Sequence, residues 1–207
     1  MHGNGPGGVE GITIFIEALL LIAALEIGDK TQLVTISLAS RHPWALVLAG
    51  AVAGLVAATA IGAAIGGLLA ASLGPWLTYI KIGGGVLFIF LGVWTVVQGL
   101  RHHWKSEEED ASPKSKRGAF GEAFSLNFLA EFGDKTQIAV IILAASYGAP
   151  ISVFLGAGLG LAAIAVMSVV IGVGLAKILS EKWLRIMSTV LFIVAGVLLI
   201  LEAAMFL

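Results

Sequence analysis

The 207-residue chain is 58% hydrophobic and only 12% charged, with a formal net charge of -1 and a mean hydropathy of +1.01. This composition excludes an ordinary soluble domain, and the lack of a basic patch gives no reason to expect nucleic acid as a partner. The chain has no cysteine, which excludes disulfides, thiolate metal sites and thiol catalysis. Since a bilayer core needs about 20 apolar residues per helix, we expect one membrane domain with about six helices.

Apolar runs and the residues that interrupt them predict six transmembrane helices. In chain order they span residues 12–39, 44–71, 76–100, 119–145, 151–179 and 183–206. All five prolines then fall in the tail, in loops or at helix starts, where a ring without an amide hydrogen does least harm. The chain therefore reads as an all-α membrane protein. It has a flexible tail at 1–11, three-helix halves at 12–100 and 119–207, and a hydrophilic linker at 101–118.

The two halves repeat one sequence pattern. One motif stands in the first helix of each half, and its second copy lies 105 positions after the first: Glu26, Gly28, Asp29, Lys30, Thr31 and Gln32 recur as Glu131, Gly133, Asp134, Lys135, Thr136 and Gln137. Glycines in the second helix of each half match at a spacing of 106: Gly50, Gly54 and Gly66 recur as Gly156, Gly160 and Gly172. Three helices is an odd number, so the second half must enter the membrane upside down. This is the inverted-topology repeat plan of secondary transporters, whose substrate sites lie near the midplane.

Lysine and arginine in the connections predict the orientation. They follow the first helix, fill the linker and surround the fifth connection, whereas the tail and the loops after helices two and four have none. By the positive-inside rule the linker is cytoplasmic and both termini lie outside.

Four carboxylates lie at membrane depth. Glu26 and Asp29 are near the centre of the first predicted helix, and Glu131 and Asp134 are near the centre of the fourth. The spacing of three residues places both acids of a helix on one face, so crossing of the two helices would bring all four together. At about 3 kcal/mol for each charge at a helix centre, such residues are retained where they line a site that binds something.

The ligand types predict which substrate the site binds. Carboxylates with threonine hydroxyls and amide oxygens form a hard-oxygen site for calcium, manganese or magnesium rather than copper or zinc. The four acids exceed Lys30 and Lys135 by two negative charges, which one divalent cation would neutralise. When the cation leaves, crowded carboxylates in low dielectric take up protons. Binding of metal and binding of protons then exclude each other, which is the condition for exchange.

Other motif residues have supporting interpretations. Each lysine either pairs with an acid or extends toward the interface, and pairing is favoured. Gly28 and Gly133 either let the helix unwind beside the acids or allow close helix packing. Thr31, Gln32, Thr136 and Gln137 add oxygens. Glu17 and its repeat partner Glu122 are either the mouths of an access path or interfacial anchors.

The heptapeptides "EIGDKTQ" and "EFGDKTQ" resemble the signature Glu-x-Gly-Asp-Lys/Arg-Thr/Ser of a membrane family. This family includes human transmembrane protein 165, its yeast Golgi homologue, chloroplast manganese transporters and bacterial manganese exporters. The resemblance implies exchange of manganese, and in some members calcium, against protons. It also implies that Glu26, Asp29, Glu131 and Asp134 form the metal site. The short loops look like those of a prokaryotic member, for which the plasma membrane and export from the cytoplasm would follow.

Three alternatives differ in class. An amino-acid-type solute exporter shares the inverted-repeat plan, but four clustered acids suit a metal better. An intramembrane aspartyl protease would use Asp29 and Asp134, yet a dyad that shares one proton has no use for two further glutamates, so we do not expect an enzyme. A binding protein without transport would lose little of its function when one acid is neutralised. The choice between manganese and calcium, the proton stoichiometry and homo-oligomerisation are open. No resident cofactor is expected.

Overall fold

The computed structural model describes residues 8–73, 76–101 and 118–173, together with six isolated positions after residue 173. Within these ranges the regular elements are all α-helices, which confirms the all-α prediction for this part of the chain. The predicted sixth helix lies outside the described ranges apart from the isolated positions. The linker lies outside them except at its two ends.

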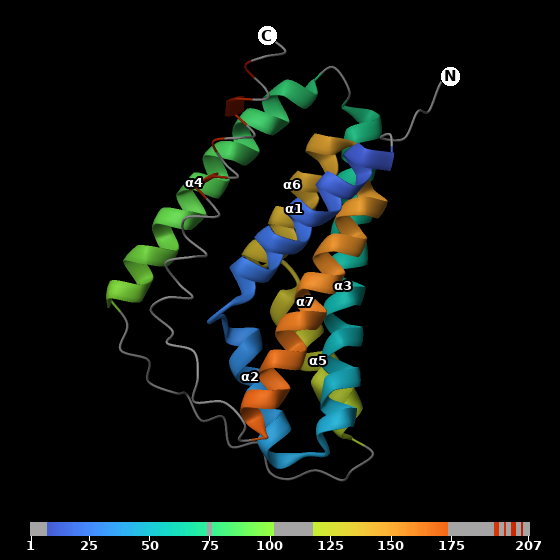
Figure 1. The fold of residues 1–207 in the computed structure, drawn as a ribbon, viewed down its shortest axis with the longest axis vertical. Coiled ribbons are helices and arrows are strands. Elements are labelled where there is room, and N and C mark those ends of the chain that lie inside the picture. Colours follow the sequence, from blue (N-terminus) through green and yellow to red (C-terminus); the bar gives the residue numbers. More distant parts are fainter. Residues whose placement is uncertain are drawn as a thin grey trace.

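Two long apolar helices pack against each other and run in opposite directions (Figure 1). They are α3 (Trp44–Ser72) and α7 (Pro150–Gly172), and both are long and apolar enough to cross a membrane. Their starts agree with the predictions to within one residue. A third long helix, α4 (Leu77–Arg101), lies to one side of the molecule in Figure 1.

The first and fourth predicted helices are broken, so the prediction of continuous helices at 12–39 and 119–145 was wrong. The first is divided into α1 (Gly8–Glu26) and α2 (Lys30–Arg41), with a bend of 71° between them. The fourth is divided into α5 (Ala119–Glu131) and α6 (Lys135–Tyr147). In Figure 1 α1 and α2 descend while α5 and α6 ascend, and both breaks lie in the middle of the molecule. The described residues provide two candidate spans, or three if α1 and α2 form one. The six-span count therefore stays a prediction.

The long helix of each half packs against the broken helix of the other half. α3 contacts α5 and α6, and α7 contacts α1 and α2. The repeated glycines allow this approach, because a Cβ on any of them would lie closer than 3.0 Å to a backbone carbonyl oxygen of the facing helix. The glycines and facing carbonyls are Gly50 with Phe120, Gly54 with Phe124, Gly66 with Ile141, Gly156 with Phe15, Gly160 with Leu19 and Gly172 with Ile36. The residues that supply the facing carbonyls also repeat, at a spacing of 105 positions. These six glycines therefore allow close packing of the helices.

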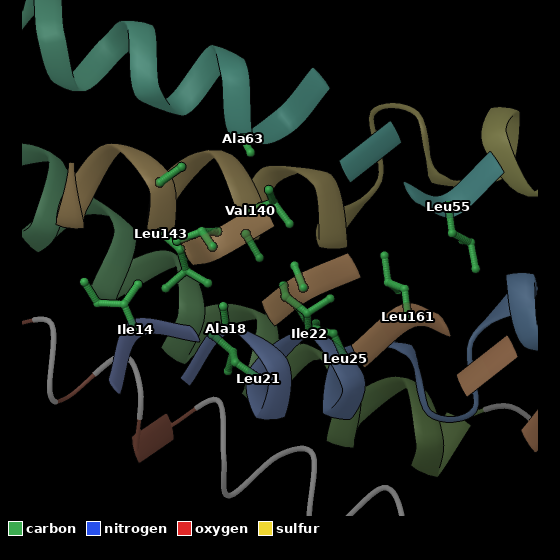
Figure 2. Packing of buried hydrophobic residues seen from close by; sticks show 14 of the residues in the cluster. Ile14, Ala18, Leu21, Ile22, Leu25, Leu55, Ala63, Val140, Leu143 and Leu161 are labelled. Atoms are coloured by element: carbon green, nitrogen blue, oxygen red, sulfur yellow. The ribbon is translucent and has the colours of Figure 1, made fainter. Parts of the chain in front are cut away.

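The largest apolar cluster contains residues of α1, α3, α4, α6 and α7. Ile22 and Leu25 of α1 face Val140 of α6 and Leu161 of α7 in the interior (Figure 2). Many large apolar side chains elsewhere, such as Leu129, are exposed, as expected for a surface that contacts lipid. At the two helix breaks the glutamates Glu26 and Glu131 are buried, whereas Gly28, Phe132 and Gly133 are exposed.

Candidate metal centre at the two helix breaks

Each break is a three-residue turn built around a glycine. Gly28 and Gly133 have φ angles of 77° and 81°, a region that favours glycine because it has no Cβ. A Cβ on either glycine would meet nothing within 4 Å, which excludes close helix packing as their role. Unwinding, one of the two predicted interpretations, is therefore correct.

The glutamine of each motif closes the turn. The backbone N–H of Gly28 donates a hydrogen bond of 2.7 Å to Oε1 of Gln32, and the N–H of Gly133 donates to Oε1 of Gln137. Both amide oxygens, which were predicted as supporting ligands, therefore accept a bond that stabilises the unwound backbone. The two glutamines therefore stabilise the backbone turns.

Replacing Gly28 with alanine is expected to lower the free energy of unfolding by about 1–2 kcal/mol, because an L-residue is strained at positive φ. Thermal unfolding in detergent, followed by tryptophan fluorescence, measures the change. Gly121→Ala is the matched control, since this α5 position also has open space around its Cβ but lies within a helix, where alanine is preferred. Equal destabilisation by both substitutions would contradict the proposed strain.

The four acids lie at helix ends rather than at helix centres. Glu26 and Glu131 end α1 and α5, and each is 1% exposed. Asp29 and Asp134 are the N-cap residues of α2 and α6, with extended backbone. The predicted helical spacing therefore does not position the acids, because the turn intervenes. The negative ends of the α1 and α5 dipoles instead meet two buried glutamates, a combination that attracts cations.

The two motifs meet across the halves of the protein. The Thr136 hydroxyl donates a hydrogen bond of 3.2 Å to Oε2 of Glu26, and Lys135 Nζ lies 2.5 Å from Oδ1 of Asp29. Electrostatic repulsion also acts between Glu26 and Glu131. Lys135 thus pairs with an acid, as predicted, but with an acid of the other motif. The Lys30 side chain lies outside what the structure describes.

Several buried oxygens at the breaks make no hydrogen bond. They include Oε1 of Glu26, Oδ2 of Asp29, both carboxylate oxygens of Glu131 and Oγ1 of Thr31. Buried polar atoms are rarely left without a partner, so this cluster has unused capacity for a cation or for protons. Among the described residues, however, no three acidic or histidine side chains are gathered closely enough to hold one metal ion. In this arrangement the acids do not form a complete ligand set.

Glu17 and Glu122 lie away from the breaks. Glu17 is half-buried in α1, nine residues before Glu26. Glu122 lies in the first turn of α5, where its Oε2 is 3.9 Å from Nε2 of His42 at the far end of α2. Their role in an access path stays a prediction.

Sequence reasoning missed two buried polar residues near the breaks. Thr35 of α2 donates a hydrogen bond of 2.9 Å to Oδ1 of Asn127 in α5, and both side chains are almost fully buried. The amide of Asn127 donates to the Ala123 carbonyl of its own helix. The available signal was spacing, since Asn127 lies four residues before Glu131 and Thr35 four residues after Thr31.

Comparison with known proteins matches both halves of the chain. A family model described as "Divalent cation/proton antiporter GDT1" matches residues 14–103 and 119–205. GDT1-like protein sll0615 of Synechocystis is 34% identical, with 87% of this chain and 93% of the relative covered. GDT1-like protein 5 of Arabidopsis thaliana is 30% identical, with 88% and 93% covered. No solved structure matches the chain.

Proposed function

Because the chain belongs to the GDT1 family of divalent cation/proton antiporters, which are integral membrane transporters, we propose that it exchanges manganese for protons by alternating access. Calcium is the second candidate substrate. We place the site at the two helix breaks, with Glu26, Asp29, Glu131 and Asp134 as the ligating acids.

One observation carries this proposal: the two motifs bind each other across the halves. Thr136 contacts Glu26, and Lys135 pairs with Asp29. Charges from both halves are therefore linked at the middle of the molecule, where movement of one half against the other would rearrange them. A site shared by two halves is what alternating access requires.

The chemistry of the donors supports a divalent cation. All four acids offer oxygen, as do the Thr31 and Thr136 hydroxyls, and such ligands suit manganese or calcium. Manganese ranks first because six ligands suffice for it, whereas calcium takes six to eight oxygens. To complete the set of ligands, the acids must move closer together than they are in this arrangement.

Exchange follows from competition for the same oxygens. The buried glutamates Glu26 and Glu131 repel each other when both are charged and have oxygens without a hydrogen-bond partner. A divalent cation or protons would each remove this repulsion, but they cannot occupy the same lone pairs together. Lys135 holds Asp29 whenever the cation does not, which neutralises one of the four carboxylates in the empty carrier.

The proposed topology has two inverted three-helix halves. The opposite course of α1–α2 and α5–α6 in Figure 1 and the crosswise glycine packing support it. Six spans with both termini outside would place Arg41 and the linker in the cytoplasm. We assign the protein to the plasma membrane of a prokaryote, where it would export the cation.

Proton movement in proteoliposomes tests the function. Vesicles that hold a pH gradient and an internal pH dye receive manganese, calcium, magnesium or an amino acid. Release of the gradient by manganese, with calcium weaker and magnesium inactive, is expected, and empty liposomes serve as the control. If an amino acid and no divalent cation moves protons, the small-solute exporter replaces this proposal.

A further inference from the structure

The hydrogen-bonded pair Thr35 and Asn127 breaks the repeat symmetry of the protein. At the offset of 105 residues, Asn127 corresponds to Ile22 and Thr35 to Val140. Ile22 and Val140 belong to the large apolar cluster on the opposite side of the breaks (Figure 2). The equivalent packing position is thus filled by a polar pair on one side of the breaks and by aliphatic side chains on the other. Packing alone therefore does not require the polar atoms.

The polar pair lies one helical turn from the acids, toward the end of the molecule that carries Arg41. On α5, Asn127 precedes Glu131 by four residues, and on α2, Thr35 follows Thr31 by four. His42, the residue that follows α2, lies at this end, with its Nε2 3.9 Å from Oε2 of Glu122. The first step from the breaks toward this end is therefore polar, and the buried apolar side chains of Leu38, Ala39 and Ala123 follow it before His42 and Glu122. In the other direction the corresponding step is aliphatic.

Resting on the function proposed above, we propose that Thr35 and Asn127 line the path of the divalent cation between the acids and the Arg41 end. Their oxygens, Oγ1 and Oδ1, belong to the hard donors that replace water around such an ion. In the structure a hydrogen bond between the two side chains closes the first step of this path, and the apolar side chains of Leu38, Ala39 and Ala123 cover the next step. Water can replace that bond when α2 and α5 separate, whereas the aliphatic closure formed with Ile22 and Val140 must expose apolar surface.

The decisive variant converts the polar step into its own repeat counterpart. Thr35→Val combined with Asn127→Ile replaces both partners, so that no buried donor or acceptor is left unpaired. Manganese-driven proton flux in proteoliposomes is expected to fall at least tenfold, while equilibrium binding of manganese changes less than threefold. The single variant Thr35→Ser keeps the hydroxyl and is expected to retain at least half of the wild-type flux. Thr59→Val is the matched control, because the buried Thr59 hydroxyl bonds only the Leu55 carbonyl of its own helix.

Flux within twofold of wild type in the double variant would overturn the path while leaving the proposed function standing. Failure of the wild type to move protons with manganese would instead overturn the proposed function.

A second measurement needs no transport. The chain has no cysteine, so Thr35→Cys and Val140→Cys each introduce a single thiol. In the cation-free protein in detergent, a hydrophilic thiol reagent is expected to modify Thr35→Cys at least ten times faster than Val140→Cys. Equal rates, or faster modification at position 140, would show that the Thr35 side is not the path.

Discussion

Replacing Glu26 with glutamine is expected to lower manganese-driven proton flux by about 100-fold or more, because the variant loses one charged ligand and one exchangeable proton. The change is nearly isosteric, and the amide oxygen can still accept the hydrogen bond from Thr136. Flux in proteoliposomes and calorimetric binding of manganese measure the loss.

The stability of this variant should move in the opposite direction to its activity. Glu26 is 1% exposed and its charge is repelled by Glu131, so a neutral side chain removes both the burial of a charge and the repulsion. Thermal unfolding without metal should therefore occur at the wild-type temperature or above it. Glu10→Gln, at an exposed position in the first turn of α1, is the control and should change neither property. Wild-type flux in Glu26→Gln would remove this residue from the site.

The class of the protein and the meeting of its two motifs were predictable from the sequence. The length of the apolar runs defined α3 to within one residue at either end, because the bilayer fixes how many residues a span needs. The duplicated charged motif predicted a shared site, since charges at that depth must be enclosed. The contacts of Thr136 with Glu26 and of Lys135 with Asp29 agree with that expectation.

The predicted helix bounds ran through both breaks because hydropathy does not register such turns, although unwinding was one of the two interpretations of Gly28 and Gly133. Apolar residues resume at Leu33 after the polar segment Asp29–Gln32, and a lone glycine is tolerated within a helix. The local signals were nevertheless present: Gly28 is suited to the end of a helix at positive φ, and Asp29 is a preferred N-cap residue. The partner of Gly28, the side chain of Gln32, could be identified only from coordinates.

The polar pair was missed for a different reason. The repeat directed attention to residues that occur twice, whereas Asn127 and Thr35 have the aliphatic counterparts Ile22 and Val140. A difference between the halves has no significance until the structure shows that the two polar side chains bond each other. The residues that occur twice predict where the shared site lies. Residues that differ between the repeats, such as Thr35 and Val140, indicate where its two sides differ.

Replacing Lys135 with methionine is expected to strengthen manganese binding and to abolish exchange. In the wild type the cation must displace the ammonium group from Asp29; without that competitor, we expect manganese to bind about tenfold more tightly, equivalent to about 1.4 kcal/mol. Flux should fall at least tenfold, because nothing replaces the cation at Asp29 when it leaves. Opposite changes in binding and flux cannot arise from misfolding.

Stability provides an independent test of the same ion pair. Removing Lys135 leaves the Asp29 carboxylate unpaired and should cost about 3 kcal/mol without metal, the lower end of the range for a buried pair, because the side chains of Lys135 and Asp29 keep 22% and 20% exposure. Manganese at 100 times its dissociation constant would add about 2.7 kcal/mol and restore most of that loss. Lys135→Arg keeps the charge and should bind manganese as the wild type does. Weaker manganese binding by Lys135→Met would mean that the lysine helps to hold the cation, and would exclude its role as a competitor for Asp29.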